Sequence, residues 1–217
     1  MGTPGNLQYP FTLDTNLNPT HERETFGARF EINAEFNHFD FKSITSYTDT
    51  ESDRHTDVDL TQLWFFNTFR PETMEVLTQE FRFSSNSEGP LQWVGGVYFM
   101  DFEETMNSFL DFGWIILEAD DPSVHVQVPF ETRREEKGNL AAFGNLTYET
   151  GAWEWGLGLR IDRWESDEEA VDIGHSASKD DVEILPKISL TRRFNNDSMV
   201  YATISKGFEP GGWVGIA

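Results

Sequence analysis

A two-residue alternation of side-chain character constrains the fold of this chain more than any other feature. One set of positions carries Trp153, Trp155, Leu157, Leu159 and Ile161, and the positions between them carry Glu154, Gly156, Gly158, Arg160 and Asp162. Successive side chains of a β-strand point to opposite faces, so this segment is predicted to be a strand with one apolar face and one small or charged face. Shorter stretches around Ile188 and Ile204 repeat the alternation. No stretch sustains the three-and-four spacing of an amphipathic helix.

Turn-forming sequences divide the chain into about eight antiparallel strands. The turn signals are Asn37-His38, residues 86–90, Thr150-Gly151-Ala152 and residues 195–198. The strands are predicted at 24–36, 39–51, 74–85, 91–103, 135–149, 152–164, 181–194 and 198–208, and longer polar connections at 52–73, 104–133 and 165–180. Long up-and-down strands, joined by short turns at one end and long loops at the other, are typical of bacterial outer-membrane barrels, in which every backbone group at hydrocarbon depth is paired.

The composition excludes several other classes of protein. The chain of 217 residues has a formal net charge of -22, with 38 acidic and 16 basic residues, which argues against a nucleic-acid partner. Its 14% aromatic content is too high for a disordered acidic tail. It has no cysteine, so thiol catalysis, disulfides and cysteine-ligated metals are excluded. No apolar run approaches the ~20 residues of a membrane-spanning helix, and the start of the chain lacks the features of a secretory signal.

Aromatic residues gather near the expected turns, and they have two interpretations. They include Phe36, Phe39, Trp93, Tyr148, Trp153 and Phe194. Such rings suit a membrane interface, where an apolar ring carries a wet edge. They are equally compatible with the core of a soluble β-sandwich, so these residues alone do not choose between the two.

Four segments resemble the barrel of TonB-dependent outer-membrane receptors. They are Gln79 to Asn86 with Gly89 to Phe99, Leu140 to Glu149 with Leu157 to Asp162, Leu185 to Leu190 with Val200 to Gly212, and Ser43 to Tyr47. The resemblance covers residues 24–213 in the family's order. It implies residues 1–23 as an extended or loop segment, 24–213 as a barrel section, and 214–217 as a truncated loop or strand end.

The resemblance further implies an importer in the bacterial outer membrane, with lipid, a plug domain and the TonB complex as partners. Family members take up scarce ligands such as ferric siderophores, cobalamin or glycans. The plug and the TonB-contacting segment are not found in this sequence, and plugged transporters have ~22 strands. The chain is therefore interpreted as an incomplete section of a large barrel, too gently curved to close, that does not transport alone.

No catalytic, cofactor-binding or metal site is predicted. Acidic clusters at residues 49–59, 120–121 and 165–172 match no calcium loop and are interpreted as solvated loops. The histidines at positions 21, 38, 55, 125 and 175 lack metal-ligand spacing. Glycine-containing stretches match no nucleophile elbow or phosphate loop, so the chain is predicted not to be an enzyme. Arg160 and Asp162, on the charged face of their strand, are expected to point into the lumen and contact the plug or the ligand.

The alternative is a soluble, secreted β-sandwich that binds carbohydrate through aromatic faces. A barrel places the apolar faces of successive strands in one outward band ~25 Å tall, whereas a sandwich packs them against each other across a core. The exposure of these side chains in the folded chain distinguishes the two.

Overall fold

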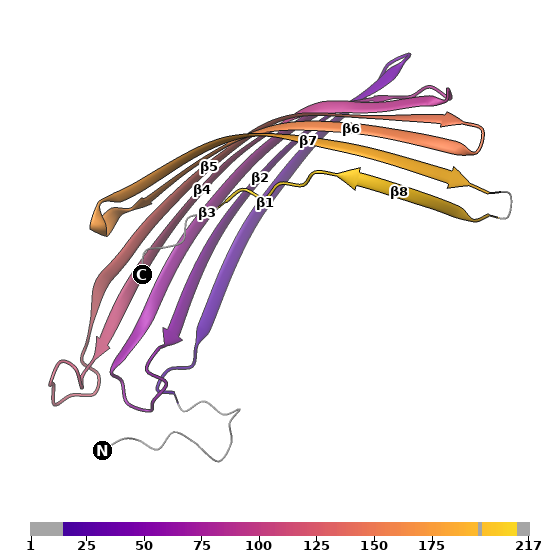
Figure 1. The fold of residues 1–217 in the computed structure, drawn as a ribbon. Coiled ribbons are helices and arrows are strands. Elements are labelled where there is room, and N and C mark those ends of the chain that lie inside the picture. Colours follow the sequence, from indigo (N-terminus) through magenta and orange to yellow (C-terminus); the bar gives the residue numbers. More distant parts are fainter. Residues whose placement is uncertain (1–14, 195–196, 212–217) are drawn as a thin grey trace.

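The computed structural model describes residues 15–194 and 197–211, which form one antiparallel sheet of eight strands in the order of the sequence (Figure 1). The strands are β1 (Thr20–Glu35), β2 (Phe39–Asp57), β3 (Phe66–Ser85), β4 (Leu91–Gly113), β5 (His125–Thr150), β6 (Trp153–Ala170), β7 (His175–Arg193) and β8 (Met199–Ser205), with a short 3-10 turn η1 (Val171–Ile173). The sheet is arched and open, and β1 and β8 each leave one edge without a partner among the described residues (Figure 1). The predicted eight-strand meander is confirmed.

Within these ranges, no helix is long and apolar enough to cross a bilayer.

Three short turns lie where the sequence places them, and the fourth, predicted at 195–198, falls partly outside the described residues. The long loops predicted at the other end are mostly strand. The connections there shrink to residues 58–65, 114–124 and 171–174, because β2 to β7 continue pairing well beyond the apolar segments. The prediction was wrong because it took the end of the apolar alternation as the end of the strand. Alternation reflects contact with lipid, whereas backbone pairing continues into water without it.

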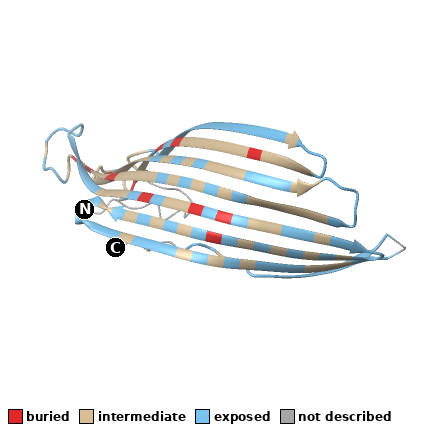
Figure 2. Ribbon diagram, turned by 90° about the horizontal axis from the view of Figure 1, so that it is seen from above, coloured by how far each residue is buried: buried red, intermediate tan, exposed pale blue. Residues whose placement is uncertain are grey.

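The two faces of the sheet have the opposite exposure to those of a soluble protein. On β6, Leu157 is 56% exposed and its apolar neighbours in the alternation are also exposed, whereas Asp162 on the other face is 2% exposed. Among the described residues, Ala141 is the only buried hydrophobic side chain, and apart from Gly113 the other buried residues are polar or charged (Figure 2). The sandwich alternative is therefore wrong, because residues 15–194 and 197–211 form a single sheet whose apolar face covers no core.

The exposed apolar face forms a continuous band across the sheet. The strand register places Phe30, Leu77, Phe99, Leu140, Leu157 and Ile184 on this same face. From Trp153 to Ile161 the band extends ~26 Å along β6, or ~20 Å once tilted by ~40°, near the ~25 Å apolar band of such barrels. Beyond the band, the first acidic residues on this face of β1 to β7 are Glu24, Asp49, Glu75, Asp101, Glu136, Glu165 and Asp180. These acids mark the edge of the hydrocarbon zone.

Aromatic rings mark the opposite edge of the band, at the short turns. Phe36 stacks on Phe39 at 4.8 Å between ring centroids, and Phe39 lies 6.0 Å from Phe83. At the turn that contains Gly151, whose φ is +58°, Trp153 lies under the guanidinium of Arg192 at 5.0 Å. Rings with an apolar body and a polar neighbour suit the membrane interface.

Gly96 on β4 has no side chain, which lets the backbone of Phe81 and the ring of Phe143 approach it closely. An added Cβ would lie 2.3 Å from the carbonyl oxygen of Phe81 and 2.8 Å from Cζ of Phe143, whose ring covers the glycine. We expect Gly96→Ala to lower the free energy of unfolding by about 1–3 kcal/mol, because backbone and ring must shift. The control is Gly27→Ala, on the same face of β1 with nothing within 4 Å of the added Cβ. Urea titration of the folded receptor in detergent measures both, and equal effects would contradict the packing argument.

Candidate functional site

The polar face of the sheet carries charged residues in lateral rows set by the strand register. One row runs across five neighbouring pairings as Lys42, Arg82, Gly96, Phe143, Arg160 and Leu185. The adjacent row on the same face runs as Glu31, Ile44, Glu80, Tyr98, Ala141, Asp162 and Glu183. All three charged members of the first row are basic, and those of the second are all acidic.

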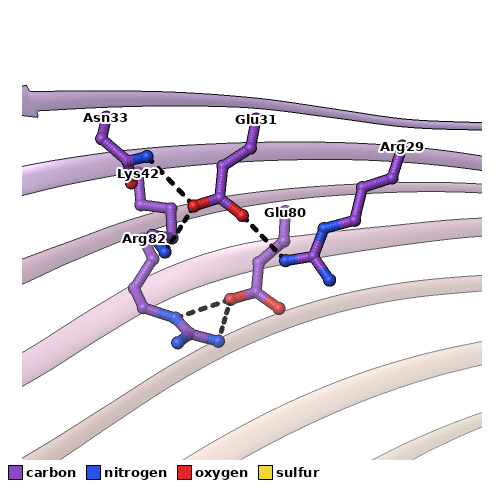
Figure 3. A network of polar contacts seen from close by, with 6 residues as sticks. All are labelled: Arg29, Glu31, Asn33, Lys42, Glu80 and Arg82. Carbon is purple, nitrogen blue, oxygen red and sulfur yellow. Dashed lines mark hydrogen bonds and ion pairs between the residues drawn. The ribbon is translucent and has the colours of Figure 1, made fainter.

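Ion pairs join the two rows, mostly along single strands. Glu31 accepts from Lys42 at 2.6 Å and from Arg29 at 2.8 Å, and Arg82 Nε donates to Glu80 at 2.7 Å (Figure 3). Asn33 also donates to Glu31, at 3.0 Å between Nδ2 and Oε1 (Figure 3). The directly opposed cations Lys42 and Arg82 are each paired with a carboxylate, which offsets their mutual repulsion. The face is thus charged but internally neutralised.

Arg160 and Asp162, the two residues singled out from the sequence, form the most enclosed of these pairs. Arg160 Nε donates to Asp162 Oδ2 at 2.6 Å and Arg160 Nη2 donates to Asp162 Oδ1 at 2.7 Å, a bidentate arrangement. The buried Asn139 donates to Asp162 Oδ1 at 3.1 Å, and the Arg160 guanidinium lies 5.7 Å from the Tyr98 ring. Both residues lie on the face opposite the apolar band, as the alternation predicts.

Further along β4 to β6, beyond the apolar band, the polar face becomes acidic. Glu104, Glu135 and Glu168 are lateral neighbours on three adjacent strands. Glu135 is buried and pairs with Lys137 at 2.8 Å, and Glu168 pairs with Arg133 at 2.7 Å. Glu104 has no such ion pair among the described residues.

Burial raises the pKa of Glu104, and the negative charges of Glu72 and Glu135 raise it further against a smaller opposing effect of Lys137 and Arg133. The pKa of Glu104 is higher in the folded state than in the unfolded state, so the folded state binds more protons at pH values between these two pKa values. Stability from this group is therefore lost as pH rises through that window. We expect Glu104→Gln to remove this group's share of any loss in melting temperature as the pH rises above the ordinary glutamate pKa of about 4.3. The exposed neighbour Glu103, changed to Gln, should leave that loss unchanged, and an equal effect there would refute the assignment.

The acidic clusters interpreted from sequence as solvated loops are partly misplaced. Residues 49–57 and 165–170 belong to strands, where alternation places Asp49, Glu51, Asp53 and Asp57 on one face of β2, and Glu165, Asp167 and Glu169 on one face of β6. Asp57 is 2% exposed and accepts from the backbone of Leu60 at 2.8 Å, and Asp59 accepts from the backbone of Phe66 at 3.1 Å. Their carboxylates organise the 58–65 connection. No group of three or more metal-ligating side chains is present within the described ranges.

A second cluster, which the sequence did not reveal, lies at the ends of β4 and β5. The Trp64 ring stacks on His125 at 4.9 Å, and His125 Nδ1 lies 2.9 Å from Asp111 Oδ1. Gly113 leaves room for the Trp64 indole, since an added Cβ would lie 2.4 Å from it. Residues from three segments meet here, so strand register was needed to bring them together. The cluster anchors the 58–65 connection to the sheet.

An arched sheet of long antiparallel strands, with an exposed apolar band and a neutralised polar face, defines a section of a transmembrane β-barrel. The sequence matches the family described as "TonB dependent receptor-like, beta-barrel" over residues 2–217, and the chain belongs to this family. These receptors are bacterial outer-membrane barrels and not enzymes, which confirms the predicted location and the absence of an enzymatic function. Among curated proteins, none matches the sequence.

Solved receptor structures share the fold at low sequence identity. The ferric yersiniabactin uptake receptor FyuA from Yersinia pestis is 18% identical with a TM-score of 0.67. The match covers 85% of this chain and 28% of the FyuA chain. The ferric citrate transporter FecA in its unliganded form is 17% identical with a TM-score of 0.61, and the match covers 85% of this chain and 27% of the FecA chain. The copper transporter OprC is 14% identical with a TM-score of 0.63, covering 85% and 30%. The chain thus spans about a third or less of these receptors.

Proposed function

We propose that this chain is the wall section of an outer-membrane importer that takes up a scarce ligand with energy from the TonB complex. The observation that supports the proposal best is the inverted exposure of the sheet. Its large apolar side chains are exposed, whereas the buried side chains are almost all polar or charged, as a lipid-facing wall around a polar lumen requires. A ferric siderophore, cobalamin or a glycan is the cargo expected from the family, and similar structures include receptors for two ferric chelates and for copper.

The test compares ligand uptake in cells that contain or lack the receptor to which this section belongs, each with and without TonB. Cell-associated siderophores, cobalamins and oligosaccharides are measured by mass spectrometry. We expect at least one ligand to accumulate only when receptor and TonB are both present. Equal ligand content in all four strains would contradict import.

The polar face of the section is proposed to contact the plug or the ligand through Arg160 and Asp162. Their bidentate pair lies on the face opposite the lipid, and Arg160 is about a third exposed, so it can meet an incoming group. Replacing both residues by Ala in the full receptor should change uptake or the thermal stability of the plug. If both properties stay unchanged, the two residues have no such role.

The section alone is proposed not to transport. The sheet is open, and the unpaired edges of β1 and β8 invite association with other strands. In liposomes that contain only this chain, no TonB-driven flux is expected. Measured flux would overturn this part of the proposal.

A further inference from the structure

The coil that follows β8 returns across the polar face and closes a pocket against the middle of the sheet. The backbone nitrogen of Lys206 donates to the carbonyl oxygen of Pro186 at 3.0 Å, and the chain then turns inward under the arch (Figure 1). Glu209, Pro210 and Gly211 contribute one side of a cavity of about 310 Å³. A volume near 300 Å³ is within the range of sites for small ligands.

The floor of this pocket is aromatic, although it lies on the polar face. Met100, Phe102 and Trp164 come from β4 and β6, and the register places them in two neighbouring rows. They lie on the same face of the sheet as Arg160 and Asp162, so they point away from lipid. Phe102 and Trp164 are half-buried, and aromatic side chains that line a cavity in this way can stack on a ligand.

Three of the four charged residues that line the pocket, Lys137, Lys179 and Asp181, are in ion pairs, and Glu209 brings the formal charge of the lining to zero. Lys137 pairs with Glu135 at 2.8 Å and lies 5.1 Å from the centroid of Phe102, and Lys179 pairs with Asp181 at 2.6 Å. An anionic ligand would have to displace these carboxylates beside the acidic row of Glu104, Glu135 and Glu168. A cationic ligand would meet two ammonium groups. The pocket therefore favours a ligand without net charge.

Uncommitted hydrogen-bonding groups remain in the pocket. Ser166 lines it, and its hydroxyl is shielded from solvent without a hydrogen-bond partner among the described residues, so a rotation about χ1 is needed to present it to a ligand. Each Lys ammonium has donors beyond the one that its carboxylate uses, and Asp181 and Glu209 retain acceptor lone pairs. A ligand that both donates and accepts through several hydroxyl groups would satisfy them, and an apolar ring face would cover Trp164.

We infer that this pocket binds an uncharged, polyhydroxylated ring compound, the chemistry of a neutral sugar unit. The inference deepens the proposed import function by naming the class of cargo, and it rests on that function only where transport is concerned. Trp164 supplies the stacking surface, Ser166 a hydrogen bond, and the two Lys–carboxylate pairs orient the hydroxyl groups.

The test is calorimetric titration of the purified full receptor in detergent. The probes are a panel of neutral oligosaccharides of glucose, mannose, galactose and xylose, with ferric citrate as the anionic comparison. We expect a neutral oligosaccharide to bind, Trp164→Ala to weaken it at least about tenfold, and Ser166→Ala to weaken it ~3- to 10-fold. The matched control is Trp155→Ala on the apolar face of the same strand, which should leave the affinity unchanged. Ser166→Ala, a change of one hydroxyl, gives a result even if Trp164→Ala does not fold.

Three results would overturn the inference: no neutral oligosaccharide binds, binding is indifferent to both Trp164 and Ser166, or ferric citrate binds through Trp164. Uptake measurements separate this failure from failure of the proposed function. TonB-dependent uptake that Trp164→Ala leaves intact would reject the pocket and keep the importer. Sugar binding without any TonB-dependent uptake would keep the pocket and reject the importer.

Discussion

Leu157→Arg should lower the free energy of unfolding by about 2–4 kcal/mol, the cost of an arginine at the bilayer midplane of a β-barrel. Leu157 lies at the centre of the apolar run on β6, between Trp155 and Leu159, and is 56% exposed in the absence of lipid. An arginine there must reach for water across the hydrocarbon zone. In a soluble protein the same exposed position would tolerate arginine with almost no cost. The size of the effect therefore reports lipid contact directly.

The matched control is Leu185→Arg on β7. Leu185 lies on the polar face, directly opposite Arg160, so the added cation meets water and one like charge, at a cost of up to about 1 kcal/mol. Urea unfolding of the full receptor in lipid vesicles measures both variants. If Leu185→Arg costs as much as Leu157→Arg, the assignment of the two faces is wrong.

The second large effect concerns the enclosed carboxylate of Asp162. Arg160→Ala leaves this side chain, 3% exposed, with Asn139 as its remaining partner. Breaking a fully buried pair costs about 3–5 kcal/mol. Because Arg160 itself is 38% exposed and partly hydrated, we expect about 2–3 kcal/mol here.

Adding Asp162→Asn to Arg160→Ala should recover most of that loss, because the amide carries no charge to leave unpaired. The same urea titration measures the single and double variants. A double variant that is less stable than Arg160→Ala would show that the cost does not come from the stranded carboxylate.

The strands and their order were predictable because lipid and lumen impose opposite demands on alternate side chains. The run from Trp153 to Asp162 shows both demands without any structural information. The short turns were predictable for a similar local reason, since Gly151 has the positive φ that its turn requires. Local patterns of this kind depend only on neighbours in sequence.

Strand length beyond the bilayer could not be read from the same pattern. The parts of β4 and β5 from Glu103 to Gly113 and from His125 to Glu136 mix charged and polar residues with apolar ones such as Phe109 and Val128, yet they remain paired. Their pairing continues because hydrogen bonding in a hairpin propagates from one residue pair to the next. The apolar alternation therefore indicated which residues face lipid, but it did not indicate how far the backbone pairing between strands extends.

The lateral rows were unpredictable for a different reason. Lys42, Arg82 and Arg160 are far apart in sequence and share a row only because each turn fixes the register of its hairpin. One feature of the pocket at Trp164 was recognisable from the sequence. Trp164 is in phase with Arg160 and Asp162, so a large aromatic side chain on the charged face was visible in the alternation itself.

Accessibility of single cysteines along β6 to lipid and to water tests the central account most directly. The chain contains no cysteine, so each substitution from Trp153 to Asp162 gives one labelling site per variant in a full receptor from which any other cysteines have been removed. Nitroxide labels in lipid vesicles are read for collision with oxygen, which concentrates in lipid, and with a water-soluble nickel chelate. The account predicts a strict period of two, with oxygen favoured at positions 153, 155, 157, 159 and 161 and the nickel chelate at the positions between them. Equal access of the nickel chelate to both sets would contradict the claim that the apolar face of this sheet contacts lipid.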